Sequence, residues 1–304
     1  MSRAVTAGGI FRKAIAATGS IFWKAVASGG IFRKAIAVAR GIFCQEVCKV
    51  RVCMGYLLGL ASLAGGLNAF LRYVAASGED ANVLEAFIVT EHTGSVFQCL
   101  LLGYLLIIAP APFVRADTCL VLYRSSRRGW NAGALLYILL QSFLYVLFLA
   151  GASAVVSYSV GFFGEAWSGS VRMLTLDESG ALSQRYKVTF HCVGMVKNMT
   201  VPQAFGITFL YLTAYFVLLG VIYYLCNLVF KGFWGLIAVA TVHLGSYFLP
   251  NQPIPRPYPG YFADGGNGLW MPLCRYLIFA MILIVISFWA VKRVDMPSRA
   301  EDEV

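Results

Sequence analysis

Three cysteines close to the start of the chain, Cys44, Cys48 and Cys53, are the first side chains that could bind a metal ion. On a helix, Cys44 and Cys48 lie on one face. A structural zinc site needs a second such pair or nearby histidines. The histidines stand far away along the chain, at His92, His191 and His243. We therefore expect these cysteines to be small apolar residues near a membrane face rather than metal ligands.

The common catalytic patterns are missing from the sequence. It contains no Gly-rich loop followed by Lys and Ser or Thr that would hold phosphates, and no serine nucleophile elbow. It also contains no two histidines one helical turn apart and no carboxylate pair inside an apolar segment. We therefore predict that this chain is not an enzyme, with no catalytic residues, no cofactor and no bound metal, and that it does not hydrolyse ATP by itself.

A small group of polar residues stands near the end of the first long apolar segment and in the segment directly after it. Asn68 and Arg72 are four residues apart and share a helical face, and Glu85 and Glu91 come soon after them. One interpretation is a polar cluster at the outer mouth of a membrane domain, in which the acids pair with Arg72. The other is that Arg72 extends to the membrane interface while Asn68 bonds a neighbouring helix.

A second polar group stands between two later apolar segments, where residues 118–125 can form a short amphipathic helix. This helix would present Tyr123 and Arg124 toward another protein, with Arg127 and Arg128 directly after it. A solvated loop that only sets membrane orientation is an equally good interpretation.

The composition indicates the kind of scaffold that carries these groups. Only 12% of the residues are charged and 59% are apolar, whereas soluble domains average about 25% charged residues. We therefore predict an all-α membrane protein, because a lone strand would leave backbone donors unpaired in lipid. Six apolar segments are long enough to be considered as spans. They are residues 54–76, 94–114, 133–160, 205–230, 233–249 and 271–291, the fifth being short.

The distribution of charges orients these spans. Lys and Arg gather before the first span, between the second and third, and after the sixth, whereas the segment after the first span carries acids and no Lys or Arg. Cytoplasmic segments are the ones enriched in Lys and Arg, so both termini are predicted to be cytoplasmic. The net charge of +10 is thereby explained by membrane orientation, and we expect contact with membrane lipid and not with nucleic acid.

The chain opens with a repeated phrase, GGIFRKAIA and its close variants, which starts near residue 8 and recurs up to residue 43. On a helix, Ile and Phe form an apolar stripe opposite Lys and Arg, the pattern of a helix that lies in the membrane interface. We therefore divide the chain into a basic amphipathic region (1–53), a six-span domain (54–292) and a cytoplasmic tail (293–304). A disordered tether remains the alternative for the repeats.

This layout resembles the permease subunits of type-2 ABC exporters. The resemblance implies a basic elbow helix before the first span, a coupling helix near residues 118–128, a short fifth span and an outer cap at residues 250–270. The sequence of residues 68–88 is similar to that of the first outer turn in small bacterial members of this family; it reads NAFLRYVAASGEDANVLEAFI. The repeated phrase and the long third outer segment depart from the family pattern.

The resemblance implies a function and partners. The chain would be the membrane-spanning subunit of an exporter in a bacterial cell membrane, driven by a separate ATPase subunit that docks on Tyr123, Arg124, Arg127 and Arg128. Six spans make one half, so a second copy or a partner permease would complete it. The alternatives are an accessory or immunity-type protein that binds a partner without transport, and, third, an ion-coupled carrier. Cys192 and Cys274 both fall on the predicted outer side, and the sequence leaves their pairing open.

Overall fold

The computed structural model describes residues 29–90, 94–114, 118–177, 180–188, 190, 192–230, 232–248, 254–258 and 268–293. The first two copies of the N-terminal repeat, Glu91 and the tail from residue 294 onward lie outside these residues, as does most of the predicted outer cap. The third copy of the repeat forms α2 (Gly29–Glu46).

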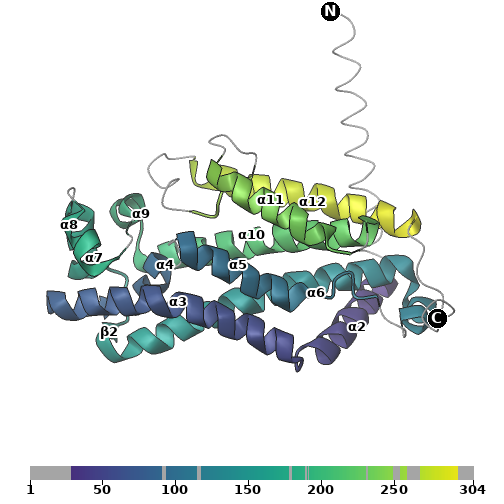
Figure 1. The fold of residues 1–304 in the computed structure, drawn as a ribbon, viewed down its shortest axis with the longest axis horizontal. Helices are drawn as coiled ribbons and strands as arrows, with labels where there is room; N and C mark the ends of the chain where they lie inside the picture. The colour runs from purple at the N-terminus through teal and green to yellow at the C-terminus, as the bar shows by residue number, and fades with distance from the viewer. Residues whose placement is uncertain are drawn as a thin grey trace, which may run out of the picture.

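Within the described residues, four helices are long and apolar enough to cross a membrane (Figure 1). They are α3 (Val50–Ser77), α6 (Thr118–Ser157) from Arg124 onward, α10 (Val201–Phe230) and α12 (Trp270–Arg293). Their apolar windows have mean hydropathies from 1.5 to 2.2. The predicted helical character of the first, third, fourth and sixth apolar segments is confirmed, and the described part of the chain has the helices of an all-α membrane protein.

Two apolar helices are shorter than the sequence predicted. The second and fifth segments form α5 (Gly94–Ile108) and α11 (Trp234–Phe248), each of 15 residues. At 1.5 Å per residue each is about 22 Å long, less than the hydrocarbon core of about 30 Å. The prediction of a span over 94–114 was therefore too long. Helix α5 ends at Ile108 because Pro110 and Pro112 lack the N–H groups that would continue it.

The six apolar helices alternate in direction along the bundle. The start of α3 crosses the end of α5, where a Cβ placed on Gly55 would lie 2.6 Å from the Gly103 carbonyl oxygen. The start of α6 meets the ends of α10 and α12, since Asn131 bonds both Tyr224 and Ser287. We call this end of the bundle, where α2 and the last turn of α12 also lie, the basic end (Figure 1).

A layer of short elements covers the opposite end (Figure 1). It contains the parallel strand pair β1 (Ala81–Asn82) and β2 (Gly161–Phe162), and α4 (Glu85–Thr90). The 3-10 turn η1 (Tyr158–Val160) leads into β2, followed by α7 (Gly169–Leu176), α8 (Ala181–Tyr186) and α9 (Val193–Asn198). We call these elements the outer layer.

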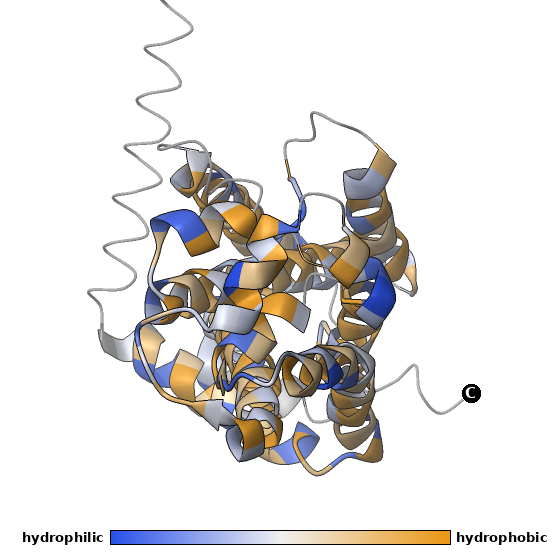
Figure 2. Cartoon of the chain, turned by 90° about the vertical axis from the view of Figure 1, so that its left-hand side faces the viewer, coloured by the Kyte–Doolittle hydropathy of each residue, from blue (hydrophilic) through white to orange (hydrophobic). Residues whose placement is uncertain are grey.

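Aromatic side chains fill the space between the central helices. Tyr104 of α5, Tyr145 of α6 and Phe216 of α10 are fully buried and in mutual ring contact, with centroids 4.9–6.0 Å apart. Many large apolar residues of the helices are exposed, and the ribbon seen from the outer layer is largely in the colours of hydrophobic residues (Figure 2). Exposed Leu, Ile, Phe and Trp on this scale are expected where helices face lipid rather than water.

Candidate functional site

Helix α2 is held closely against the first turns of α6. Its apolar side, with Ala35, Val38 and Ala39 buried, faces α6, and its bases Lys34 and Arg40 are exposed. A Cβ placed on Gly133 of α6 would lie 2.6 Å from the Val38 Cβ and 2.9 Å from the Ala35 carbonyl oxygen. The missing side chain at position 133 thus allows the two backbones to approach.

The predicted short helix over residues 118–125 is present as the first part of α6, and we call it the connector helix. It is separated from the long apolar part by Ser126, whose φ of 71° and ψ of 156° are not helical. The Gly129 N–H donates a hydrogen bond to the Ser126 hydroxyl at 3.4 Å, so the break is followed at once by a new helix start. Trp130, only 2% exposed, anchors this start in the protein.

The three arginines predicted to bind a partner stand at this break. Arg124 and Arg128 are exposed at the basic end. Arg127 is also exposed, but its guanidinium donates a hydrogen bond to the Lys292 carbonyl at 3.2 Å and so bonds the last turn of α12. The side chain of Tyr123 lies outside the described residues. The structure therefore brings the arginines together and gives one of them a structural contact that the sequence did not reveal.

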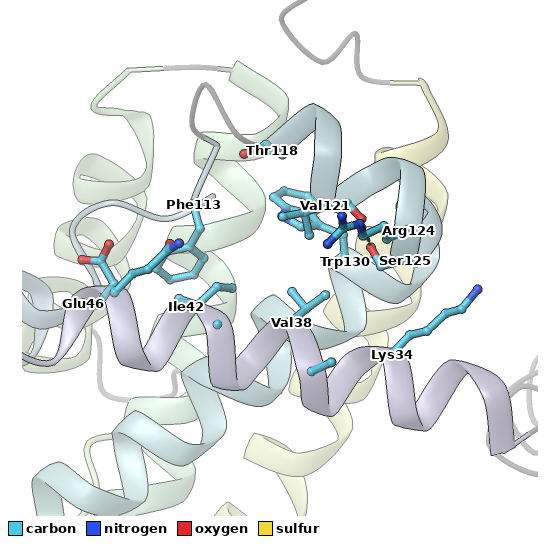
Figure 3. Close-up of a pocket in the computed structure, with 13 residues that line it drawn as sticks. Lys34, Val38, Ile42, Glu46, Phe113, Thr118, Val121, Arg124, Ser125 and Trp130 are labelled. Carbon is cyan, nitrogen blue, oxygen red and sulfur yellow. Dashed lines mark hydrogen bonds between the residues drawn. The ribbon is translucent and has the colours of Figure 1, made fainter.

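A cavity of about 250 Å³ opens between α2 and the connector helix (Figure 3). Val38 and Ile42 of α2 form its floor, and Phe113 and Val121 form part of its wall. Lys34 and Arg124 lie toward one end of it, and Glu46 lies at the other (Figure 3). The cavity is therefore apolar inside and carries charge at its ends.

The negative charge of Glu46 is balanced by two neighbouring cations. Its side chain is fully buried, and Lys49 contacts one carboxylate oxygen at 3.1 Å while Arg51 pairs with the other. A buried carboxylate needs such partners, because an unpaired charge away from water is costly. The other cations among the described residues that line the cavity are Lys34 and Arg124.

The predicted outer cluster is not assembled as expected. Asn68 and Arg72 are exposed on α3. Glu85 is fully buried and bonded to Ser168 and Asn82 instead of to Arg72. Glu91 lies outside the described residues. The pairing of Arg72 with Glu85 was therefore wrong: the helix turns Arg72 outward, while Glu85, as the first residue of α4, faces the start of α7.

Glu85 is held by three hydrogen bonds. Its carboxylate accepts from the Ser168 N–H at 2.6 Å, from the Ser168 hydroxyl at 2.7 Å and from the Asn82 N–H at 3.0 Å. Burial raises the pKa of Glu85 above its ordinary value, and the hydrogen bonds from Ser168 and Asn82 act in the opposite direction. These bonds join β1 and α4, which follow α3 in the chain, to the start of α7 within the outer layer.

Other polar residues inside the bundle bond neighbouring helices. Gln141 donates to the Tyr56 hydroxyl at 2.9 Å, and Asn227 joins the Ala111 carbonyl to the Gly235 N–H. His243 meets the Tyr215 hydroxyl at 3.0 Å. Each of these three side chains thus bonds a neighbouring helix or the backbone beside it, whereas Gln98 is exposed.

Sequence reasoning missed Asn131 and Ser168. Asn131 donates to the Ser287 hydroxyl at 3.1 Å and accepts from the Tyr224 hydroxyl at 2.7 Å, which bonds α6 to both α10 and α12. Both residues lie between predicted spans, in segments where polar residues are common and do not by themselves indicate a contact. A signal was available for Ser168, since a serine directly before a helix is a common N-cap, and its hydroxyl does accept from the Val171 N–H.

In the described ranges, no group of three His, Cys, Asp or Glu side chains could hold a metal ion. Cys44, Cys48 and Cys53 are exposed. Cys192 is buried with its Sγ 3.9 Å from the Ile88 carbonyl oxygen, whereas Cys274 is exposed, and the two are not joined.

Comparison with known proteins places the chain in no group. The sequence and the structure match no family model, no curated protein and no solved structure. The function must therefore be argued from the charges and contacts of the basic end.

Proposed function

We propose that this chain is the membrane-spanning subunit of an ATP-driven exporter and that a separate ATPase subunit docks on the connector helix. The observation that carries the proposal is the break at Ser126. It separates a short helix, which carries the exposed Arg124, from a long apolar helix that begins with the exposed Arg127 and Arg128. A displacement of the connector helix by the ATPase would be transmitted directly to the long apolar part of α6, which follows it in the chain.

Two contacts support transmission of such a displacement beyond α6. Arg127 bonds the last turn of α12, and Asn131 bonds α10 and α12 a few residues later. The connector helix is therefore linked, within about two helical turns of its end, to three of the long apolar helices. Coupling between distant sites needs contiguous packed elements of this kind.

The proposal includes an orientation. Exposed Lys and Arg gather at the basic end, on α2, on α6 and at the end of α12, which favours the cytoplasmic side for that end. In this arrangement all six apolar helices enter the membrane, with α5 and α11 too short to cross it fully on their own. Both termini would then be cytoplasmic, in a bacterial cell membrane. The proposal also requires a second half, either another copy of this chain or a different permease.

The test is whether an ATP-hydrolysing subunit is purified together with the chain. The tagged full chain is purified from its own membranes in mild detergent, and ATP hydrolysis per mole of chain is measured for the wild type and for Arg124→Glu with Arg128→Glu. We expect the purified wild type to hydrolyse ATP through its bound ATPase subunit. The rate per mole of chain should fall at least tenfold in the charge-reversed variant, because acidic side chains would repel the acidic ATPase surface that the arginines are proposed to bind. Arg127 is left unchanged, because its loss would also release α12.

A matched control is available on α2. Arg33→Glu with Arg40→Glu reverses two exposed charges at the same end of the bundle without touching the connector helix. This control should keep its hydrolysis. If the wild type carries no hydrolysis, or if reversal at Arg124 and Arg128 leaves it undiminished, the exporter proposal fails. A partner-binding accessory protein would then be the better description.

A further inference from the structure

The cavity between α2 and the connector helix has the chemistry of an amphiphile site. Its floor and walls are apolar, from Val38, Ile42, Phe113 and Val121, and Trp130 closes its inner side. Hydroxyl groups are supplied by Thr118 and Ser125. A ligand that filled it would need a hydrocarbon part against this floor and a polar part near the connector helix.

The charge at the cavity favours an anionic polar part. Lys34 of α2 and Arg124 of the connector helix both line the cavity toward the same end, so a negatively charged group bound there would be attracted to both cations (Figure 3). The acid at the far end, Glu46, is already paired with Lys49 and Arg51. Among the described lining residues, the charges that remain after the ion pairs of Glu46 are thus those of Lys34 and Arg124, which are positive and complement a phosphate.

The position of the cavity identifies the source of such a ligand. One wall is α2, whose bases are exposed and whose sequence pattern is that of a helix in the membrane interface. A position of α2 in the membrane interface would place the cavity at the depth of lipid phosphates, beside apolar spans. About 250 Å³ admits a headgroup and the first carbons of a chain, so the remainder of the chain must continue along the bundle into the bilayer.

We propose that this cavity binds one anionic phospholipid, with its phosphate between Lys34 and Arg124 and its first chain carbons on Val38 and Ile42. The lipid would contact α2 and the connector helix together and so stabilise their relative position. This inference requires that α2 lies at the membrane surface, and it does not depend on the docking of an ATPase.

Two glycines of α2 allow a sharp test. Gly41 lines the cavity, and a Cβ placed there meets nothing within 4 Å, so Gly41→Leu extends a side chain into the cavity without a backbone clash. Gly30, near the start of the same helix, has the same open surroundings and does not line the cavity. Gly30→Leu is therefore a matched control for the added volume and for the change in helix propensity.

The measurement is native mass spectrometry of the purified full chain titrated with dioleoyl phosphatidylglycerol and, separately, with dioleoyl phosphatidylcholine. We expect the wild type to retain one phosphatidylglycerol at least tenfold more tightly than phosphatidylcholine. Gly41→Leu should lose this binding at least tenfold, and Gly30→Leu should keep it. Lys34→Gln, which adds no bulk, should reduce the preference for the anionic lipid even if Gly41→Leu fails to fold.

Three results would overturn the proposal. The first is equal retention of the two lipids by the wild type. The second is unchanged binding in both Gly41→Leu and Lys34→Gln. The third is displacement of the lipid by inorganic phosphate at millimolar concentration, which would indicate a site for a free anion rather than for a lipid. An effect of Arg128→Glu on ATP hydrolysis with unchanged lipid binding would separate this site from the proposed ATPase surface, because Arg128 does not line the cavity.

Discussion

Glu85 and Ser168 stand 83 residues apart in the chain and are joined by two hydrogen bonds inside the outer layer. The Ser168 N–H and hydroxyl both donate to the Glu85 carboxylate. The same hydroxyl accepts from the Val171 N–H, so Ser168 is the N-cap of α7. One carboxylate thus fixes the start of a helix that belongs to a distant part of the sequence.

Removing this carboxylate should weaken the outer layer. Glu85→Ala leaves the Ser168 and Asn82 donors buried without their acceptor, and we expect a loss of about 1.5–3 kcal/mol of unfolding free energy. Thermal unfolding in detergent, followed by circular dichroism, measures the change. Asp80→Ala removes an exposed acid from the same loop and should leave the midpoint nearly unchanged. Equal midpoints for the two variants would contradict a structural role for the Glu85 contacts.

The same carboxylate should make stability depend on pH. Burial raises the pKa of Glu85 in the folded protein above its value in the unfolded chain. Between the two pKa values the folded state binds more protons, so this residue's contribution to stability is full below the unfolded pKa. It is lost as the pH rises through the folded pKa. The midpoint of the wild type relative to Glu85→Gln should therefore rise on acidification through this window. A constant difference across it would refute the raised pKa.

The close approach of α2 and α6 predicts that Gly133 tolerates no side chain. Gly133→Ala places a methyl group against Val38 and the Ala35 backbone, so α2 must move, and such overpacking typically costs about 1–3 kcal/mol. We expect faster tryptic cleavage after Lys34 and Arg40. Gly151→Ala adds the same group to α6 where nothing lies within 4 Å, and it should leave the cleavage rate unchanged. Identical cleavage in both variants would show that α2 is not held at Gly133.

Asn131 should be a main contributor to helix association at the basic end. Asn131→Leu removes the acceptor of the buried Tyr224 hydroxyl, and an unsatisfied buried group typically costs about 1–3 kcal/mol. The expected result is a lower midpoint of thermal unfolding. Gln98→Leu makes a comparable change at an exposed position and is the reference. A midpoint for Asn131→Leu as high as the reference would mean that the bonds from Asn131 contribute little.

The connector helix shows how far the sequence could predict the candidate site. A short amphipathic helix between two apolar segments was one of the two interpretations of residues 118–125, and the helix is present there. Its relation to the rest of the site did not follow, because the bond from Arg127 to Lys292 joins residues 165 apart. The cavity was likewise invisible in the sequence, since its walls come from α2 and from the two sides of the connector helix.

The sequence by itself determined the helical, apolar character of the bundle and the ends at which bases gather. These properties depend on local composition, because a segment of about 20 apolar residues is helical in lipid whatever its neighbours. The tertiary structure alone decided that Arg72 faces outward while Glu85 is buried, that Ser126 breaks α6, and that α2 folds back on Gly133. The reason is physical: hydropathy is a property of one segment, whereas burial and hydrogen bonding of a polar group depend on which distant segment lies against it.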